Sequence, residues 1–282
     1  MNSMKQKLRR SLFCGSLVVH AALLHGGLVG SLEVDETFIE HHRVSEKLAE
    51  ILDQHSKELA RLVDAVHATE RQKHGVWTFK WLPGYYVKYN VSRMVKRERI
   101  SLCIQEENLH LLHTPEKYLY HLKERPTEFT SLNYVVICKK VHDSKDEYHI
   151  PMDLEQVQQF IMLIEKTGHL STFEPNFLRL SDRRISFIDT DGSFNRDKPN
   201  TGFVRLLDRN LSHYYTAEAL AYILDKIAEH LVLETDDKRR DKCLSDLDLY
   251  VSRQNTKVRE KIIKVLAEYT QHYLKKRDKG TK

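Results

Sequence analysis

Apolar residues recur at intervals of three and four along an early stretch of the chain, which is the pattern of a helix with one apolar face. They predict one long helix over about residues 36–70, within an N-terminal amphipathic segment at 32–72. Because the 44–66 stripe is shorter than four heptads, packing on the chain's own body is favoured, and docking of a protein partner is the alternative. The positions on the stripe are Val44, Leu48, Leu52, His55, Leu59, Leu62 and Val66.

Further along, aromatic and β-branched residues become frequent. Val76–Trp81 and Tyr85–Tyr89 flank Pro83-Gly84, which predicts two short strands joined by a turn. A helix is expected over residues 96–113. The apolar run Tyr134–Cys138 is bounded by polar residues and predicts a buried strand.

The C-terminal half is expected to be mostly helical. Asp153 with Gln156 resembles a capping box, and the helix that it would start ends at Thr167-Gly168. Two short apolar runs, Phe177–Leu180 and Ile185–Ile188, predict a small hairpin. After it we expect a polar loop to about residue 204, helices over about 216–232 and 254–277, and a solvated loop or helix face at the charge run 236–242.

The composition excludes several classes of protein. The chain is 41% hydrophobic with only 10 Gly and 4 Cys in 282 residues, which excludes collagen-like, disulfide-scaffold and wholly disordered chains. The net charge is +5, from 45 basic and 40 acidic residues. Residues 1–31 hold four basic residues and no acidic one, so the remainder carries 41 − 40 = +1. Nucleic acid is therefore not expected as a partner, because phosphate neutralisation needs a basic surplus on the folded domain.

The four basic residues form a cluster that precedes an uncharged stretch with an apolar run at Leu17–Leu24. Val29-Gly30-Ser31 then offers small residues at the two positions that a signal peptidase recognises. This order predicts a secretory signal peptide over residues 1–31, so we expect the protein to be exported and secreted. The alternative is a membrane anchor formed by residues 11–32, although its glycine and histidine residues weaken insertion.

Cysteine and histidine residues do not have the spacing of metal ligands. Removal of the signal peptide would leave Cys103, Cys138 and Cys243, which lie too far apart for a zinc motif. Cys103 and Cys138 lie in apolar stretches and are expected to be buried thiols. The histidines that we expect on the surface are His41, His42, His110 and His113.

The order of elements and polar residues resembles that of the protein-kinase-like superfamily over about residues 75–232. Lys88 lies on a predicted strand, and Glu107 follows 19 residues later on the predicted helix. His169–Asn176 aligns without a gap to the kinase catalytic loop. Asp189-Thr-Asp-Gly192 follows the hairpin and resembles the metal-binding strand end of aminoglycoside and choline kinases.

The resemblance implies an α+β, bilobal kinase-like domain at 75–280, preceded by the long helix. The strand-rich N-lobe would cover about 75–142, and the helical C-lobe about 150–280. Lys88 and Glu107 would form an ion pair that holds the phosphates of ATP. The resemblance also assigns Mg²⁺ to the oxygen ligands Asn176 and Asp189, with Asp191 as a further ligand and with Asp189 and Asp191 as the catalytic carboxylates.

Two departures from the kinase pattern change the expected function. Ser171 occupies the position of the catalytic-loop aspartate, and a neutral hydroxyl cannot accept the proton of a substrate. The glycine-rich loop is also missing, since only Gly75 and Gly84 lie in the strand region. We therefore expect a pseudokinase that acts as a regulatory or binding module with ATP and Mg²⁺.

Two alternatives stay open. In the first, the protein is an active atypical phosphotransferase in which Glu174 or Asp191 positions the substrate in place of the missing aspartate. In the second, it binds no nucleotide and acts as a partner-binding protein through the 44–66 stripe.

Overall fold

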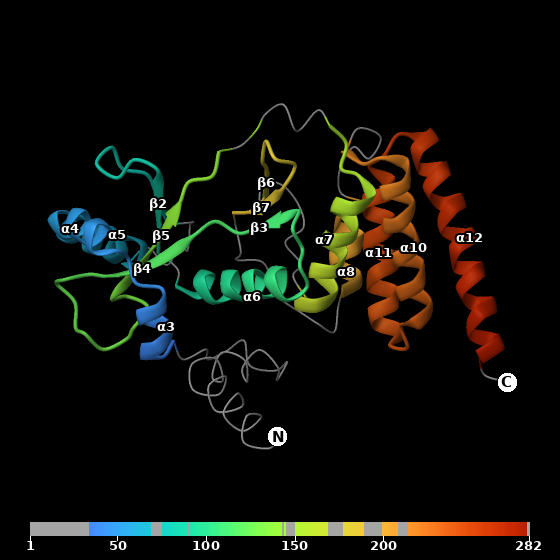
Figure 1. Cartoon of the computed structure of the whole chain (residues 1–282). Coiled ribbons are helices and arrows are strands. Elements are labelled where there is room, and N and C mark those ends of the chain that lie inside the picture. The colour runs from blue at the N-terminus through green and yellow to red at the C-terminus, as the bar shows by residue number, and fades with distance from the viewer. Residues whose placement is uncertain are drawn as a thin grey trace, which may run out of the picture. The chain divides into compact units, whose positions relative to one another are not determined.

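The computed structural model describes residues 34–68, 75–89, 91–142, 144, 150–168, 177–188, 199–207 and 214–280. The architecture is α+β, and the chain divides into two compact units (Figure 1). The first unit contains residues 1–99 and 116–140, and the second contains 100–115 and 141–282. The division differs from the predicted lobes, because residues 100–115 join the helical unit while the N-terminal helices join the strand-rich one.

The first unit contains a four-stranded antiparallel sheet in the order β1-β2-β5-β4. The two predicted strands around Pro83-Gly84 are confirmed, since the register pairs Val76 with Lys88 and Gly84 takes the positive φ that the turn requires. The predicted buried strand is confirmed as β5, whereas the edge strand β4 was not expected. The strands are β1 (Val76–Trp77), β2 (Tyr85–Lys88), β4 (Lys117–His121) and β5 (Tyr134–Lys139).

The prediction of one long helix before the sheet is wrong. The described residues there form α3 (Glu36–His41), α4 (Glu46–Gln54) and α5 (Ser56–Ala68). The chain leaves the helical conformation after α3 because it pairs with the edge of β4. The Leu119 N–H donates to the His42 carbonyl at 2.6 Å, and the Val44 N–H donates to the Leu119 carbonyl at 3.2 Å.

The apolar stripe packs inside the first unit. Its buried members, with Val63 in place of Leu62, contact one face of the sheet around Val87, Val135 and Ile137. Packing on the chain's own body, the favoured interpretation, therefore accounts for the stripe, and docking of a partner there stays a prediction. The buried residues of the stripe are Val44, Leu48, Leu52, Leu59 and Val63.

The opposite face of the same sheet is covered by α3 and by the beginning of α6 (Ser92–Glu106). Met94 and Val95 of α6 pack with Val136 of β5. The predicted helix at 96–113 is therefore displaced toward the N-terminus. It ends earlier than expected because Asn108 has a left-handed φ of 52°, which the regular helix does not allow.

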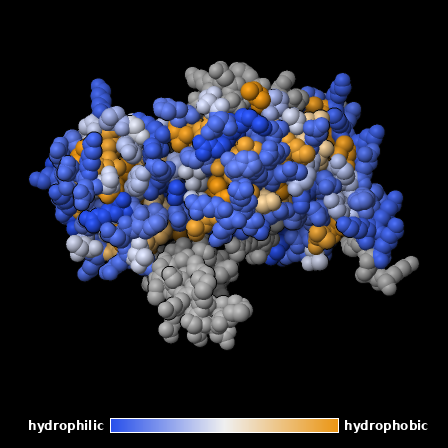
Figure 2. Space-filling view, in the orientation of Figure 1, coloured by the Kyte–Doolittle hydropathy of each residue, from blue (hydrophilic) through white to orange (hydrophobic). Residues whose placement is uncertain are grey.

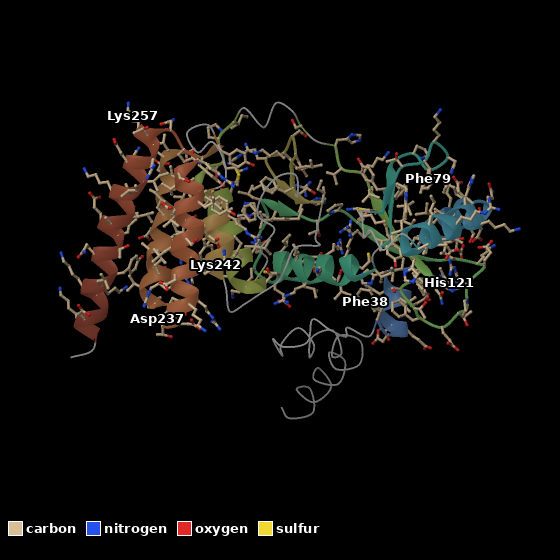
Figure 3. The ribbon with its side chains drawn as sticks, turned by 180° about the vertical axis from the view of Figure 1, so that it is seen from behind. Phe38, Phe79, His121, Asp237, Lys242 and Lys257 are labelled. Atoms are coloured by element: carbon tan, nitrogen blue, oxygen red, sulfur yellow. The ribbon has the colours of Figure 1, made fainter. Side chains whose placement is uncertain are left out.

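The second unit combines a small sheet with a helical bundle. The sheet has the order β3-β7-β6, in which β6 and β7 are the predicted hairpin and β3 joins in parallel. Helix α10 packs against α12 and α7. The helices expected near 216–232 and 254–277 are confirmed, and the charge run begins α11, as Asp237 and Lys242 show in Figure 3. The elements are β3 (Leu112–His113), α7 (Leu154–Thr167), β6 (Phe177–Arg179), β7 (Ile185–Phe187), α8 (Pro199–Arg205), α10 (Ala217–Leu233), α11 (Asp237–Ser252) and α12 (Thr256–Gly280).

Helix α7 has the predicted caps at both ends. The Asp153 side chain accepts from the Gln156 N–H at 3.0 Å, and the Gln156 side chain accepts from the Asp153 N–H at 3.0 Å. Gly168 ends the helix in the left-handed conformation with a φ of 70°.

We expect Asp153→Ala to lower the free energy of unfolding by about 1 kcal/mol, because the first turn of α7 loses its capping acceptor. Asp153→Asn keeps an acceptor at this position and loses only the exposed ion pair with Arg183, so it should lie close to the wild type. Urea unfolding followed by far-UV circular dichroism measures both variants. Equal losses in the two variants would show that the ion pair, and not the cap, is responsible.

The surface visible in Figure 2 is mostly hydrophilic, and hydrophobic residues show as separate patches. Among the described residues, no helix combines the length and the apolar character that a membrane span requires. The predicted signal peptide and the alternative anchor at 11–32 lie outside the described residues. Cys103, Cys138 and Cys243 are buried free thiols, and burial raises the pKa of Cys243 to about 12.

Candidate functional site

Lys88 is the last residue of β2, opposite Val136 of β5. Because side chains alternate along a strand and directly paired residues share a face, Lys88 lies on the same face as Val136 and Leu119. This is the face that α3 and α6 cover, and we call it the α6 face. The Lys88 side chain is only 7% exposed, so it is more buried than a solvated strand lysine.

The α6 face carries a second lysine that was not predicted from the sequence. Lys117 of β4 pairs with Cys138 of β5, which places it on the same face as Lys88, and it is only 3% exposed. Arg93, at the start of α6, is buried as well. Lys88, Lys117 and Arg93 are the buried lysine and arginine residues among the described residues of this unit.

Tyr86 lies two residues before Lys88 and therefore on the same face of β2. Its ring is exposed, and the Lys140 ammonium lies over it at 5.0 Å from the ring centroid. The α6 face thus ends in an accessible aromatic ring next to cationic groups, an arrangement that can bind a flat ring joined to an anion.

Glu107 was predicted in the middle of a helix, but it is the first residue after α6 ends. Its carboxylate accepts from the Lys166 ammonium of α7 at 2.6 Å, and this hydrogen bond raises the pKa of Lys166. The early end of α6 thus gives Glu107 a partner within the second unit. Its pairing with Lys88 stays a prediction.

The other predicted site residues, Asn176, Asp189 and Asp191, lie outside the described residues, as does Ser171. The strands between them are described. Phe177, the first residue of β6, pairs with Phe187, the last residue of β7, across the hairpin. The chain positions that follow Asn176 and precede Asp189 therefore meet at one end of the hairpin.

Glu98 and His42 form an interaction that sequence reasoning missed. The Glu98 carboxylate lies 3.2 Å from His42 Nε2 and accepts from Arg97 Nη1 at 2.8 Å. Burial alone would raise the pKa of Glu98, but His42 and Arg97 outweigh it, and the pKa is lowered. The expectation that His42 lies on the surface is wrong, because its ring is buried beside Phe38. His42 and Glu98 are 56 positions apart along the chain, so no local spacing could indicate the pair.

A hollow of about 380 Å³ lies beside the edge strand β4. Its lining includes the hydrophobic residues Val44, Leu119 and Tyr134 and the charged residues Arg43 and Asp53. Lys88 and Glu107, the predicted site residues that the structure describes, do not line it, so we take the α6 face as the candidate site.

Comparisons with known proteins add no identification. No family model matches the chain, and no curated protein and no solved structure matches it either.

Proposed function

We propose that the chain is a divergent member of the protein-kinase-like superfamily, a pseudokinase that binds ATP with Mg²⁺ and acts as a regulatory or binding module. The observation that carries this proposal is the pair of buried lysines, Lys88 and Lys117, on one face of the first sheet. Two ammonium groups on one face of the sheet concentrate positive charge there, and concentrated positive charge favours a polyanionic ligand.

The order of the elements supports the same proposal. Strand β2 with Lys88 is followed along the chain by α6, β3, β4 and β5, and then by α7 and the β6-β7 hairpin of the second unit. Phe177 pairs with Phe187 in that hairpin, and along the chain Asn176 directly precedes Phe177 while Asp189 follows Phe187 by two residues. An amide oxygen and a carboxylate at one end of a hairpin suit Mg²⁺.

Binding is tested by the melting temperature of the full chain with ATP and Mg²⁺. At a ligand concentration ten times Kd, the stabilisation is about 1.4 kcal/mol, which corresponds to a rise of roughly 3–6 °C. Adenosine with Mg²⁺ is the control without phosphates and should give a much smaller rise. An unchanged melting temperature at millimolar ATP would contradict the proposal.

Turnover separates the proposed pseudokinase from an active phosphotransferase. Because Ser171 cannot act as the catalytic base, we expect ADP to form no faster with the wild type than with Asp189→Ala. Faster ADP release by the wild type, lost in Asp189→Ala, would instead favour the active alternative.

A further inference from the structure

We propose that His41, His42 and Glu98 form a binding site for a zinc ion in the first unit, independent of the proposed nucleotide site. His41 is the last residue of α3, His42 follows it, and Glu98 lies in α6. Phe38, labelled in Figure 3, marks helix α3, which ends at His41 and is followed by His42. One ligand atom from each of the three side chains lies within 4.8 Å of the others.

The hydrogen bonds of His42 indicate which of its two ring nitrogens carries a proton. Nδ1 lies 2.8 Å from the Phe38 carbonyl oxygen, which can only accept, so Nδ1 carries a proton. In a neutral ring, Nε2 then presents its lone pair to the Glu98 carboxylate at 3.2 Å. Two acceptors facing each other at this distance require a proton or a metal cation between them.

The second histidine favours the metal. A proton shared by His42 and Glu98 needs only these two groups, whereas a metal ion needs further ligands. A second imidazole is present, because the His41 ring lies edge to face with the His42 ring at a centroid distance of 5.0 Å. His41 is exposed, so its side chain can rotate to bring a nitrogen closer. The group therefore offers two imidazoles and one carboxylate to a common point.

The geometry and the ligand chemistry suit Zn²⁺. Zinc binds imidazole nitrogen and carboxylate oxygen at about 2.0–2.2 Å, so adjacent ligand atoms of a tetrahedral site lie roughly 3.3–3.5 Å apart. The 3.2 Å between His42 Nε2 and Glu98 Oε2 is close to that edge. Three protein ligands leave a fourth position for water. Mg²⁺ and Ca²⁺ fit poorly, because they prefer oxygen ligands.

The surroundings already hold the ligands in place. The Nδ1 hydrogen bond of His42 to a backbone carbonyl is the outer contact that commonly orients a metal-binding imidazole. The His42 backbone is fixed as well, since its carbonyl accepts from Leu119 of β4. Zinc bound here would connect the end of α3 to α6.

Arg97 is the competitor of the metal. Its guanidinium donates to the same Glu98 oxygen at 2.8 Å, and both side chains are largely buried. A divalent cation at His42 would repel this guanidinium, so metal binding has to displace Arg97 or use the second carboxylate oxygen. Removal of the positive charge at this position should therefore strengthen zinc binding.

Isothermal titration of the metal-free full chain with ZnCl₂ tests the site. We expect a component of one zinc per chain whose affinity falls at least tenfold in His41→Ala and in Glu98→Gln and rises several-fold in Arg97→Gln. His41→Ala changes an exposed side chain, so it should fold normally. Co²⁺ should show the visible absorption of a four-coordinate site in the wild type and lose it in the same two variants.

His110→Ala is the matched control. His110 lies 3.2 Å from Glu155, the same separation as in the proposed site, but among the described residues no third ligand joins this pair. Zinc affinity should stay at the wild-type value in this variant. Wild-type binding that His41→Ala leaves unchanged, or the absence of a one-to-one component, would show that His42 and Glu98 form only an ion pair.

Discussion

Replacement of Lys88 by alanine is expected to remove most of the stabilisation that ATP with Mg²⁺ gives to the full chain. The ammonium lies on the α6 face, where a phosphate would meet it with little competition from water. A tenfold loss of affinity reduces the stabilisation at ten times the wild-type Kd from about 1.4 to about 0.4 kcal/mol. Melting temperatures over a range of ATP concentrations measure the change.

Two further variants separate the charge of Lys88 from its packing and from surface charge. Lys88→Met keeps an apolar stem of similar length, so it should fold like the wild type and still lose the effect of ATP. Lys139→Ala removes a lysine from the neighbouring strand, where it pairs with Tyr85 on the opposite face and forms an exposed ion pair with Glu116. This control should keep the full effect. If Lys139→Ala and Lys88→Met weaken ATP binding equally, the α6 face is not the site.

Local sequence signals predicted the elements whose structure depends on near neighbours. Asp153 and Gln156 are three residues apart, so the capping box of α7 can be recognised without knowledge of the fold. Pro83-Gly84 and the apolar runs beside it likewise identified the first antiparallel strand pair. In each case the residues that determine the conformation lie within a few positions of one another.

Contacts between distant residues explain what the sequence could not predict. The break between α3 and α4 depends on hydrogen bonds to Leu119, more than seventy residues later. The helical spacing of apolar residues continues through the break, so the sequence predicted an uninterrupted helix. The strand that contains Leu119 mixes polar and aromatic residues and lacks a simple alternating pattern. His42 is buried for a related reason. Its backbone carbonyl bonds to Leu119 of β4 and its ring lies next to Glu98 of α6, and neither contact can be recognised from the helical pattern around His42.

The candidate site was only partly predictable. Lys88 was identified by its place on a strand, but the burial of Lys117 depends on the pairing of β4 with β5. Glu107 shows the opposite effect: its distance from Lys88 along the chain suited an ion pair, but α6 ends at Glu106, and the Glu107 carboxylate pairs with Lys166. The pairing of Glu107 with Lys166 of α7 could not be predicted from that distance, because it depends on where α6 ends.

An aromatic cluster holds the β6-β7 hairpin of the second unit onto α7. Phe160 of α7 packs edge to face against Phe187 at a centroid distance of 5.1 Å and against Phe177 at 5.7 Å. Its side chain is 1% exposed. Because Phe177 and Phe187 form the pair at one end of the hairpin, Phe160 supports the strands that lead to Asn176 and Asp189.

Phe160→Ala is therefore expected to lower the free energy of unfolding by about 3–5 kcal/mol, through lost apolar burial, the cavity that remains and the lost ring contacts. Urea unfolding followed by far-UV circular dichroism measures this loss. Met162→Ala, two residues further along the same helix, shortens an exposed side chain and should cost well under 1 kcal/mol.

Because the hairpin leads to the proposed Mg²⁺ ligands, Phe160→Ala should also weaken the stabilisation by ATP at temperatures where it is still folded. A loss of stability no larger than that of Met162→Ala would mean that the cluster does not hold the hairpin in place.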